Sequence, residues 1–372
     1  RVGGVGLGHY TYHLLRNLKQ IDKDNEYVIF FDSTVRQKDI EKFNSGNFSA
    51  RFFPYQKYGK FLPGKYKDIM LSGFLNREKL DIFHMIGLSN TIPPKISAKL
   101  VFTARGLGRL KAPEHYSSGA IKTARIVRKM VIENAGEIHI IVPTEEMKKD
   151  AGAILRIPDE KISIIHEGID RRLCDAATEE IIDRVKRKYN LGNHAILYMG
   201  TIEPSKNIPR MLEAYKKFRG KIGWYYKLVI AGKDGWMADE IRNIAVDLEI
   251  ANDVVFTNYI PPEDLSALFK AATMFMFVPL YEGFGTPVVE AMACGLPIVA
   301  SDLPVLREVA GNAALFANPY DTEAMANMML KIAKDKSAGK TCIENGFERI
   351  KNFCWEKTAR QTLEVYNKVI KL

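Results

Sequence analysis

Short apolar runs recur along the chain, separated by longer segments in which apolar and polar residues mix. Runs without polar alternation are typical of strands buried on both faces of a parallel sheet. In several of the longer segments, apolar residues recur at the three- or four-residue spacing of a helix face. This alternation of strand and helix predicts an α/β fold. The expected strands are 27–31, 80–84, 99–103, 138–143, 162–166, 195–200, 227–232, 254–256, 274–279 and 297–301.

The alternation pauses once, in the charged residues 171–190, which we interpret as a linker and a surface helix. A chain of 372 residues is long enough for two domains of ordinary size. We therefore expect two doubly wound parallel-sheet domains, the first over 1–170 and the second over 171–354. An amphipathic helix over 355–372 is expected to pack back towards the first domain.

A glycine-rich segment opens the chain, with Gly4, Gly6 and Gly8 directly before a helical pattern. A glycine loop that leads into a helix offers backbone N–H groups at the positive end of the helix dipole, which suits phosphate. A tight turn uses the same glycines without any ligand, so both interpretations remain open. Because the loop follows Arg1 directly, we expect a strand or a targeting segment upstream of this sequence.

The segment 281–297 combines a loop, a helix start and a helix end. Gly283 and Gly285 allow turns and close backbone approach. Thr286 is expected to cap the following helix, with Pro287 at its first position. The helix is expected to end at Gly295. Such a helix start is a second site suited to an anion.

Three charged side chains lie near this helix start or near a similar turn. Glu282 precedes the helix and Glu290 lies one turn inside it, while Lys206 follows the strand expected at 195–200. A carboxylate accepts two hydroxyls, so these acids suit a ribose and a sugar, and the lysine suits a diphosphate. Acids near a helix start also stabilise its dipole by about 0.3–1 kcal/mol without any ligand, and a lysine there is commonly only solvated.

Ligands of doubly wound sheets bind beyond the carboxyl ends of the strands, and clefts between domains are favoured sites. In the first domain we expect His84 and the residues after Thr103, including Arg105, at this edge. Two catalytic carboxylates are also used by glycosidases, but nothing in the sequence sets the separation of Glu282 and Glu290.

Composition narrows the class of protein. The chain is 47% hydrophobic and 26% charged, as in globular proteins, and no apolar run approaches the roughly 18–20 residues of a membrane span. Residues 1–170 hold 27 Lys and Arg against 19 Asp and Glu, and so carry most of the net charge of +10. This basic half and the basic, aromatic stretch 51–67 are compatible with an anionic partner such as lipid head groups, although a solvated loop is the simpler explanation of the stretch. The four cysteines have no metal-ligand spacing and are interpreted as reduced thiols.

The segment Glu282–Gly295 resembles the Glu-x7-Glu motif of family 4 glycosyltransferases of the GT-B fold, which consists of two Rossmann-like domains facing across a cleft. The resemblance extends over nearly the whole chain. The other segments that carry it are Gly4–Tyr10, Asp81–His84, His166–Asp170, Gly200–Asn207, Ser301–Gly311 and Phe353–Ala359.

The resemblance implies transfer of a sugar from a nucleotide donor with retention of anomeric configuration and without a metal. Lys206 would meet the diphosphate, and Glu282 would hold the donor sugar together with the loop backbone of Gly283, Phe284, Gly285 and Thr286. In such enzymes the second acid, here Glu290, takes the ribose hydroxyls. The glycine loop with Gly4, Gly6 and Gly8 would close over the diphosphate.

Two positions depart from the family pattern. Arg105-Gly106 stands where members commonly have His-Asp, and the arginine that commonly accompanies the donor lysine is replaced by Thr201 and Ser205. Arg105 cannot act as a general base at neutral pH, because a guanidinium stays protonated. Our hypothesis is that Arg105 supplies the missing cation from the first domain, which makes it a catalytic candidate beside Lys206 and Glu282.

The resemblance therefore predicts a cytoplasmic hexosyltransferase, peripheral to the inner face of the cell membrane, that builds a polysaccharide or lipid-linked glycan. GDP-mannose is the first expectation for the donor, ahead of a UDP-sugar, and we expect neither a metal nor a nucleic-acid partner. The departures leave open a catalytically inactive scaffold or sensor that only binds nucleotide sugars. A two-domain solute-binding protein would have no need of Lys206, Glu282 and Glu290 together.

Overall fold

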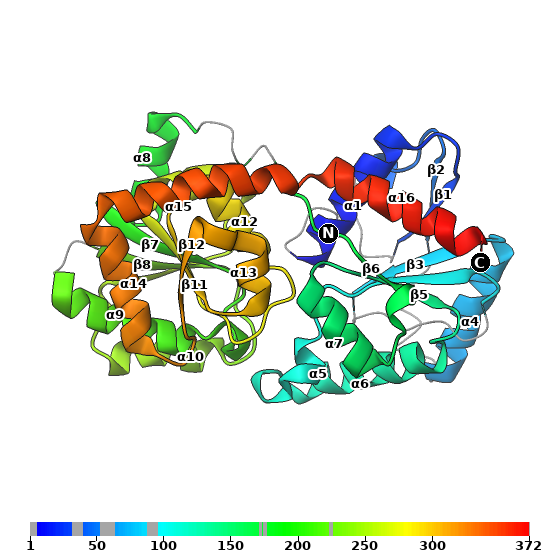
Figure 1. Ribbon diagram of the computed structural model, residues 1–372, viewed down its shortest axis with the longest axis horizontal. Coiled ribbons are helices and arrows are strands. Elements are labelled where there is room, and N and C mark those ends of the chain that lie inside the picture. Colours follow the sequence, from blue (N-terminus) through cyan, green and yellow to red (C-terminus); the bar gives the residue numbers. More distant parts are fainter. Residues whose placement is uncertain are drawn as a thin grey trace. The chain divides into compact units, whose positions relative to one another are not determined.

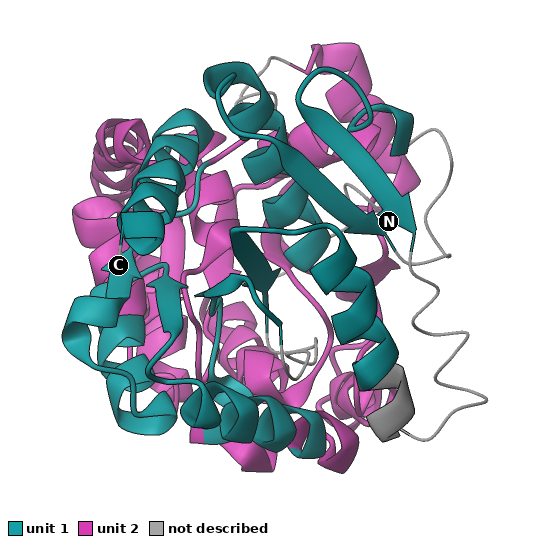
Figure 2. Ribbon diagram, turned by 90° about the vertical axis from the view of Figure 1, so that its right-hand side faces the viewer, with its two compact units in different colours: residues 1–110, 122–168, 354–372 teal, residues 111–121, 169–353 magenta. Residues whose placement is uncertain are grey.

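The computed structural model describes residues 6–31, 40–52, 64–87, 96–170, 173, 177–222 and 226–371. The chain folds into two compact units (Figures 1 and 2). Unit 1 comprises residues 1–110, 122–168 and 354–372, and unit 2 comprises residues 111–121 and 169–353. The short segment 111–121 therefore belongs to unit 2, although the chain on both sides of it belongs to unit 1.

Unit 2 is built on a six-stranded parallel sheet in the order β12-β11-β10-β7-β8-β9. The chain runs outward from β7 to β9, returns to the other side of β7 with β10, and runs outward again to β12. The order in which strands are added to the sheet therefore reverses between β7 and β10. Doubly wound folds bind their ligands at such a switch point. The strands are β7 (His194–Met199), β8 (Tyr226–Ala231), β9 (Val254–Asn258), β10 (Met274–Phe277), β11 (Ile298–Ser301) and β12 (Ala314–Ala317).

Helices surround this sheet and bury its apolar strands (Figure 1). All four residues of β10 and of β11 are buried, as expected of central parallel strands. Helices α9 and α14 pack together, as do α8 and α11. The helices of unit 2 are α8 (Glu179–Lys188), α9 (Ile208–Ile222), α10 (Ala238–Asp247), α11 (Pro262–Ala271), α12 (Thr286–Ala293), α13 (Pro304–Ala310), α14 (Thr322–Lys334) and α15 (Lys336–Arg349).

Unit 1 contains two parallel sheets among its described residues. One has the order β3-β4-β5-β6, and the other pairs β1 with β2. Side chains link the two sheets, because the rings of Phe30 on β1 and Phe83 on β3 lie 6.3 Å apart. The strands are β1 (Tyr27–Phe31), β2 (Phe48–Phe52), β3 (Ile82–Ile86), β4 (Lys99–Thr103), β5 (Ile138–Val142) and β6 (Ile162–Ile164).

The first and last helices of the chain pack against each other within unit 1. Trp355, at the start of the last helix α16 (Trp355–Lys371), stacks on His13 of α1 (Leu7–Ile21), with ring centroids 5.2 Å apart, and meets Tyr10 edge-on at 5.4 Å. Gly168 leaves room for this tryptophan, because a Cβ at residue 168 would lie 2.2 Å from the backbone nitrogen of Trp355. The remaining helices are α4 (Gly64–Arg77), α5 (Gly108–Lys111), α6 (Ser118–Glu133) and α7 (Glu145–Leu155). Lys111 of α5 and the first residues of α6 belong to unit 2.

Each predicted strand has a counterpart in the structure, but two strands were missed. Strand β2 lies among residues that alternate polar and apolar, and β12 has only four residues and lies at the edge of its sheet. Two further predictions fall outside the described residues: Gly4 and most of the basic, aromatic stretch 51–67. The strand expected ahead of the first glycine loop stays a prediction.

Two local predictions were wrong. Helix α12 begins at Thr286 and is capped by Gly285, so that Thr286 is the first helical residue rather than the cap. Gly285 has a φ of 90°, a left-handed conformation that glycine adopts without strain and that starts the helix one residue earlier than expected. His84 is not at a strand end, because β3 continues to Ile86.

Candidate functional site

The turns that follow β7 and β10 meet at the switch point of the unit 2 sheet. The backbone N–H of Leu280, after β10, donates to the carbonyl of Ser205, after β7, over 3.1 Å. The buried side chain of Asn207 donates to the carbonyls of Val278 and Pro319, over 3.0 and 2.7 Å. These bonds hold the two turns in a fixed register, so that their side chains project from one edge of the sheet.

Lys206 and Glu282 form an ion pair at this edge. The lysine Nζ lies 2.8 Å from Glu282 Oε2, and the two side chains are 21% and 18% exposed. Burial alone would lower the pKa of Lys206, but the charge and hydrogen bond of Glu282 outweigh it and raise that pKa above its usual value. The ammonium also lies 5.9 Å from the centre of the Phe277 ring. The Lys206 ammonium therefore stays charged and remains partly exposed to solvent.

The loop before α12 presents its backbone rather than its side chains. Phe284 is 2% exposed and packs edge-on against Phe353, with ring centroids 5.6 Å apart. Gly285 has no room for a Cβ, which would lie 2.7 Å from a methyl group of Leu306. The backbone N–H groups that open a helix have no partners within that helix, so this loop suits an anion.

The two acids that flank this loop differ in their surroundings. Glu282 Oε2 faces Lys206, and its Oε1 accepts from the backbone N–H of Gly283 over 3.3 Å. Glu290 lies one turn inside α12 and is half-exposed. Unit 2 thus places Lys206, Glu282 and the start of α12 together. The donor contacts of Gly283, Thr286 and Glu290 stay predictions.

Two further polar side chains lie beside Lys206. The hydroxyl of Ser205, which is 1% exposed, donates to Glu203 Oε1 over 2.6 Å. Burial raises the pKa of Tyr116, from the segment 111–121, while the nearby positive charge of Lys206 opposes that rise. Tyr116 was not predicted from the sequence, because no spacing rule links a residue in the first 170 to the turn after β7.

The first glycine loop is described from Gly6 onward, in unit 1. Gly6 caps α1 with a φ of 73°, and Gly8 lies in the first turn of that helix. The helix is strongly amphipathic and buries Tyr10, His13 and Leu14. Its start therefore has the conformation expected of an anion loop, but the contacts predicted for these glycines stay untested.

Arg105 has a partner that the sequence did not reveal. Its guanidinium Nε and Nη2 donate to the two carboxylate oxygens of Glu167, each over 2.6 Å. Glu167 is 1% exposed, and the guanidinium also lies 5.1 Å from the centre of the Tyr10 ring. This bidentate pair links the loop after β4 to the residues after β6 within unit 1. A catalytic part for Arg105 stays a hypothesis.

His84 is half-buried in unit 1, between β3, β4 and α16. Its ring nitrogens are 2.6 Å from the hydroxyl of Tyr366 on α16 and 2.7 Å from that of Thr103 on β4. Burial lowers the pKa of His84 to about 3, so the imidazole is neutral. The prediction that His84 stands at the ligand-binding edge was wrong, and this residue joins three elements instead.

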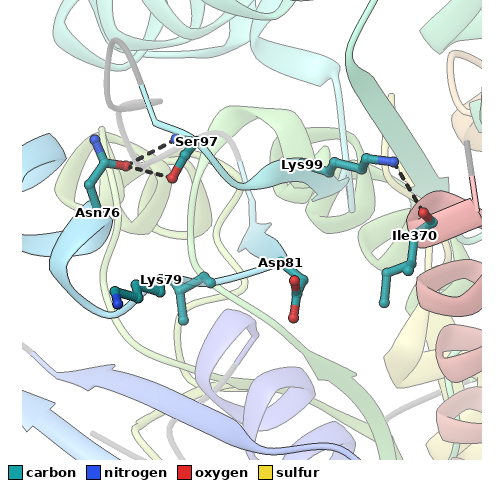
Figure 3. A pocket seen from close by; sticks show the side chains of 7 residues that line it. Asn76, Lys79, Asp81, Ser97, Lys99 and Ile370 are labelled. Atoms are coloured by element: carbon teal, nitrogen blue, oxygen red, sulfur yellow. Dashed lines mark hydrogen bonds between the residues drawn. The ribbon is translucent and has the colours of Figure 1, made fainter.

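A hollow of about 360 Å³ lies at the opposite, amino edge of the four-stranded sheet (Figure 3). It is bordered by the turn before β3, including Asp81, and by Lys99 at the start of β4. The Lys99 ammonium donates to the carbonyls of Val369 and Ile370, over 3.1 and 3.2 Å, and so caps the end of α16. None of the predicted site residues lines this hollow.

Within the described part of the chain, no helix is long and apolar enough to cross a membrane.

Two parallel-sheet units, each of Rossmann type, define the GT-B class of α/β proteins. The chain belongs to the family 4 glycosyltransferases: residues 4–173 match the model of Glycosyltransferase Family 4, and residues 180–349 match that of Glycosyl transferases group 1. It is therefore an enzyme that transfers sugars.

Several curated relatives are mannosyltransferases. The O-antigen chain mannosyltransferase B of Escherichia coli is 26% identical over 97% of this chain and 96% of its own length. The serotype-specific mannosyltransferase WbdA of Escherichia coli is 30% identical over 51% of this chain, which spans only 24% of that protein.

Solved structures share the fold along the whole chain. Sucrose-phosphate synthase from Thermosynechococcus elongatus has a TM-score of 0.76 at 21% identity, covering 98% of this chain and 94% of that one. Anabaena HepE in complex with UDP and glucose has a TM-score of 0.74 at 17% identity, covering 98% and 97%. The predicted fold class is thus confirmed.

Proposed function

We propose that this glycosyltransferase moves mannose from GDP-mannose to a hydroxyl of a growing glycan or lipid-linked acceptor, with retention of anomeric configuration. The observation that carries this proposal is the Lys206–Glu282 pair beside the start of α12, at the switch point of the unit 2 sheet. A cation, a set of backbone N–H groups and a carboxylate at one sheet edge match the parts of a sugar nucleotide.

Each part of the proposed donor has a partner of matching chemistry. The diphosphate takes the Lys206 ammonium and the N–H groups that open α12, which releases Glu282 from its ion pair. Glu282 then accepts hydroxyls of the sugar, and Glu290 accepts those of the ribose. Because the negative charge of the leaving diphosphate grows in the transition state, Lys206 and the helix start stabilise that state more than the bound donor.

In this proposal the reaction needs no metal ion, because the lysine and the helix start supply the positive charge. The leaving phosphate itself takes the proton of the acceptor hydroxyl. The proposal would be contradicted by turnover that is lost after dialysis against a chelator and restored by a divalent cation.

The identity of the donor is supported by the names of relatives. O-antigen chain mannosyltransferase B is similar along the whole chain, which favours mannose and a polysaccharide or lipid-linked acceptor. HepE is a structural neighbour that was solved with UDP and glucose, so a UDP-sugar is the competing donor. The basic composition of residues 1–170 is consistent with a peripheral position at an anionic membrane, where a lipid-linked acceptor would be.

A donor panel tests the proposal. Purified protein is offered GDP-mannose, UDP-glucose, UDP-galactose and UDP-N-acetylglucosamine, and nucleotide release and binding are measured for each. GDP-mannose is expected to bind most tightly and to be the donor that turns over, with the anomeric proton of the product keeping the donor's configuration by NMR. Binding and turnover of a UDP-sugar alone would replace mannose, and binding without turnover across many acceptors would favour an inactive scaffold.

Substitution of Lys206 provides the matched control for this assay. Lys206→Met keeps the aliphatic stem but removes the charge, so turnover should fall by roughly 10²–10³-fold, as when one charge-stabilising group of a transition state is lost. Lys216→Met, on an exposed position of α9, should turn over like the wild type. Equal turnover in both variants would remove Lys206 from the mechanism.

A further inference from the structure

Two histidines share one face of α1. His9 and His13 are four residues apart, the spacing that places side chains above one another on a helix. Their ring centroids lie 4.3 Å apart, and a ring nitrogen of His9 lies within 4.8 Å of one of His13. Two histidines at this spacing form a pattern with which helices bind transition metals.

Packing within unit 1 fixes one ring of this pair. His13 is 4% exposed and stacks on Trp355, with an angle of 15° between the ring planes. The helices that carry the two rings, α1 and α16, lie side by side (Figure 1). Stacking engages the faces of an imidazole, whereas a metal ion binds a nitrogen in the ring plane. The contact with Trp355 therefore orients His13 for a metal ion without using its nitrogens.

His9 is the more accessible member of the pair. It is half-exposed and meets Trp355 edge-on, with ring centroids 6.1 Å apart. Two nitrogens that bind one tetrahedral Zn²⁺ ion lie about 3.3 Å apart. A rotation of the His9 side chain brings its nitrogen to this separation from that of His13, and its exposure gives the ion a path of entry.

The chemistry of the pair selects the ion. Imidazole suits Zn²⁺, Ni²⁺ and Cu²⁺, whereas Mg²⁺ and Ca²⁺ require oxygen ligands. We propose that His9 and His13 form a bidentate site for Zn²⁺ and chemically similar ions, with water completing the coordination. This inference goes beyond the proposed function and does not depend on it, because the proposed transfer needs no metal ion.

A bound ion joins two successive turns at the start of α1. This helix is capped by Gly6, which has no side chain to hydrogen-bond the first N–H groups. The folded helix holds both imidazoles close together and the unfolded chain does not, so the ion binds the folded form more tightly. Zn²⁺ therefore stabilises α1 by mass action.

The experiment uses the full chain after treatment with a chelator and removal of that chelator. Calorimetry at neutral pH measures the Kd and the stoichiometry of Zn²⁺, Ni²⁺ and Mg²⁺. His9→Gln removes one ligand at a half-exposed position, and His13→Phe removes the other while keeping a ring against Trp355. His194→Gln is the matched control, because His194 is exposed in unit 2.

The wild type should bind Zn²⁺ and Ni²⁺ with a stoichiometry of one ion per chain, and should not bind Mg²⁺. In His9→Gln and in His13→Phe the Kd of Zn²⁺ should rise by at least roughly 10–100-fold, the loss that already follows removal of an outer-shell partner of a ligand. His194→Gln should keep the wild-type Kd. If His13→Phe does not fold, as judged by circular dichroism, His9→Gln decides the matter alone.

Two further measurements locate the ion. Ni²⁺ quenches the fluorescence of a nearby indole, and the Trp355 ring lies beside both histidines. Ni²⁺ should therefore quench part of the tryptophan fluorescence with the Kd found by calorimetry, and His9→Gln should abolish this quenching. Zn²⁺ should also slow hydrogen exchange in α1 of the wild type, while the strands β7 and β10 keep their rates.

Three results would overturn the inference. The first is a wild type that binds no stoichiometric Zn²⁺. The second is a Kd that stays unchanged in the variants at residues 9 and 13, or that rises equally in His194→Gln, because the ion would then bind elsewhere. The third is binding that neither quenches fluorescence nor slows exchange in α1.

Discussion

At the scale of single residues, Arg105 and Glu167 form a bidentate ion pair whose acid is almost fully buried. Removing one partner of a buried pair leaves the other charge without compensation, which costs about 3–5 kcal/mol. Arg105→Ala should therefore lower the free energy of unfolding by roughly that amount in urea titrations. Arg125→Ala, at an exposed position of α6, is the control and should change it by less than about 0.5 kcal/mol.

The same pair allows the catalytic hypothesis for Arg105 to be tested separately. In the double variant Arg105→Met/Glu167→Met no buried charge is left unpaired, so much of the lost stability should return. If this stable double variant turns over like the wild type, Arg105 is a structural residue. If it is stable but inactive, the guanidinium has the catalytic part that the sequence suggested. A stability of Arg105→Ala equal to that of the control would contradict the structural account.

His84 should make the protein sensitive to acid. An exposed histidine titrates near pH 6.5, whereas burial lowers the pKa of His84 to about 3 in the folded protein. The unfolded chain therefore binds the proton more readily, and stability is complete above about pH 6.5 and declines as the pH falls towards 3. Between pH 7.5 and pH 5 the wild type should lose up to about 2 kcal/mol more than His84→Asn, measured by urea unfolding. Parallel losses in the two proteins would contradict this prediction.

Site residues could be predicted from the sequence where they lie close together in one short motif. Glu282 and the loop before α12 follow each other in the chain, and turn chemistry placed them correctly to within one residue. The partner of Arg105 lies 62 residues further on, and no local rule identifies such a partner. The same holds for Tyr116, whose pKa is influenced by the charge of Lys206 from another part of the chain.

At the scale of elements, the polar contacts between the α8 region and α11 converge on a single acid. Asp264 on α11 is 2% exposed and accepts from Arg184 Nη2 at 2.9 Å, Lys188 Nζ at 2.5 Å and the Tyr189 hydroxyl at 2.8 Å. Burial alone would raise the pKa of Asp264, but the hydrogen bonds of Lys188 and Tyr189 outweigh it and lower that pKa below its usual value. The helix predicted in the charged segment 171–190 is thus held by polar contacts as well as by its apolar face.

Asp264→Asn should therefore destabilise the protein at neutral pH by roughly 2 kcal/mol, because several hydrogen bonds lose their charged acceptor. Since the folded pKa of Asp264 is depressed, its stabilisation is complete above the unfolded value of about 3.9 and is lost as the pH falls through the folded value. The difference between variant and wild type should shrink in urea titrations at pH 3. Asp247→Asn, at an exposed position of α10, serves as the control. A difference that persists unchanged at pH 3 would show that the charge of Asp264 is not responsible.

Element boundaries show why hydrophobic pattern alone succeeds for some strands and fails for others. Strand β5 is buried at every position, and its apolar run was unmistakable. Strand β2 is buried fully only at Phe48 and includes Ser49 and Arg51, so that it lacks the continuous run on which the prediction relied. Strand β12 has only four residues and lies at an edge, where sequence requirements are weakest.

At the scale of the whole molecule, the chain leaves unit 1 at Gly168 and returns to it at Cys354, so that its last helix completes the unit with which it began. The first contact after this return is Trp355, which is 5% exposed and packs on Tyr10 and His13 of α1. The two ends of the sequence therefore depend on each other, and unit 1 is completed only by residues at the far end of the sequence.

Trp355→Ala should consequently destabilise unit 1 by about 3–5 kcal/mol, since it removes a large buried side chain and leaves a cavity. Hydrogen exchange, followed segment by segment, should accelerate in α1 and α16 while the strands β7 and β10 of unit 2 keep their protection. Trp236→Ala is the matched control, because Trp236 is 41% exposed in unit 2. Gly168→Ala should reproduce the unit 1 effect from the other side of the contact, because its Cβ would clash with the Trp355 backbone. Equal acceleration in both units would contradict this account, because it would mean that the two units unfold as one.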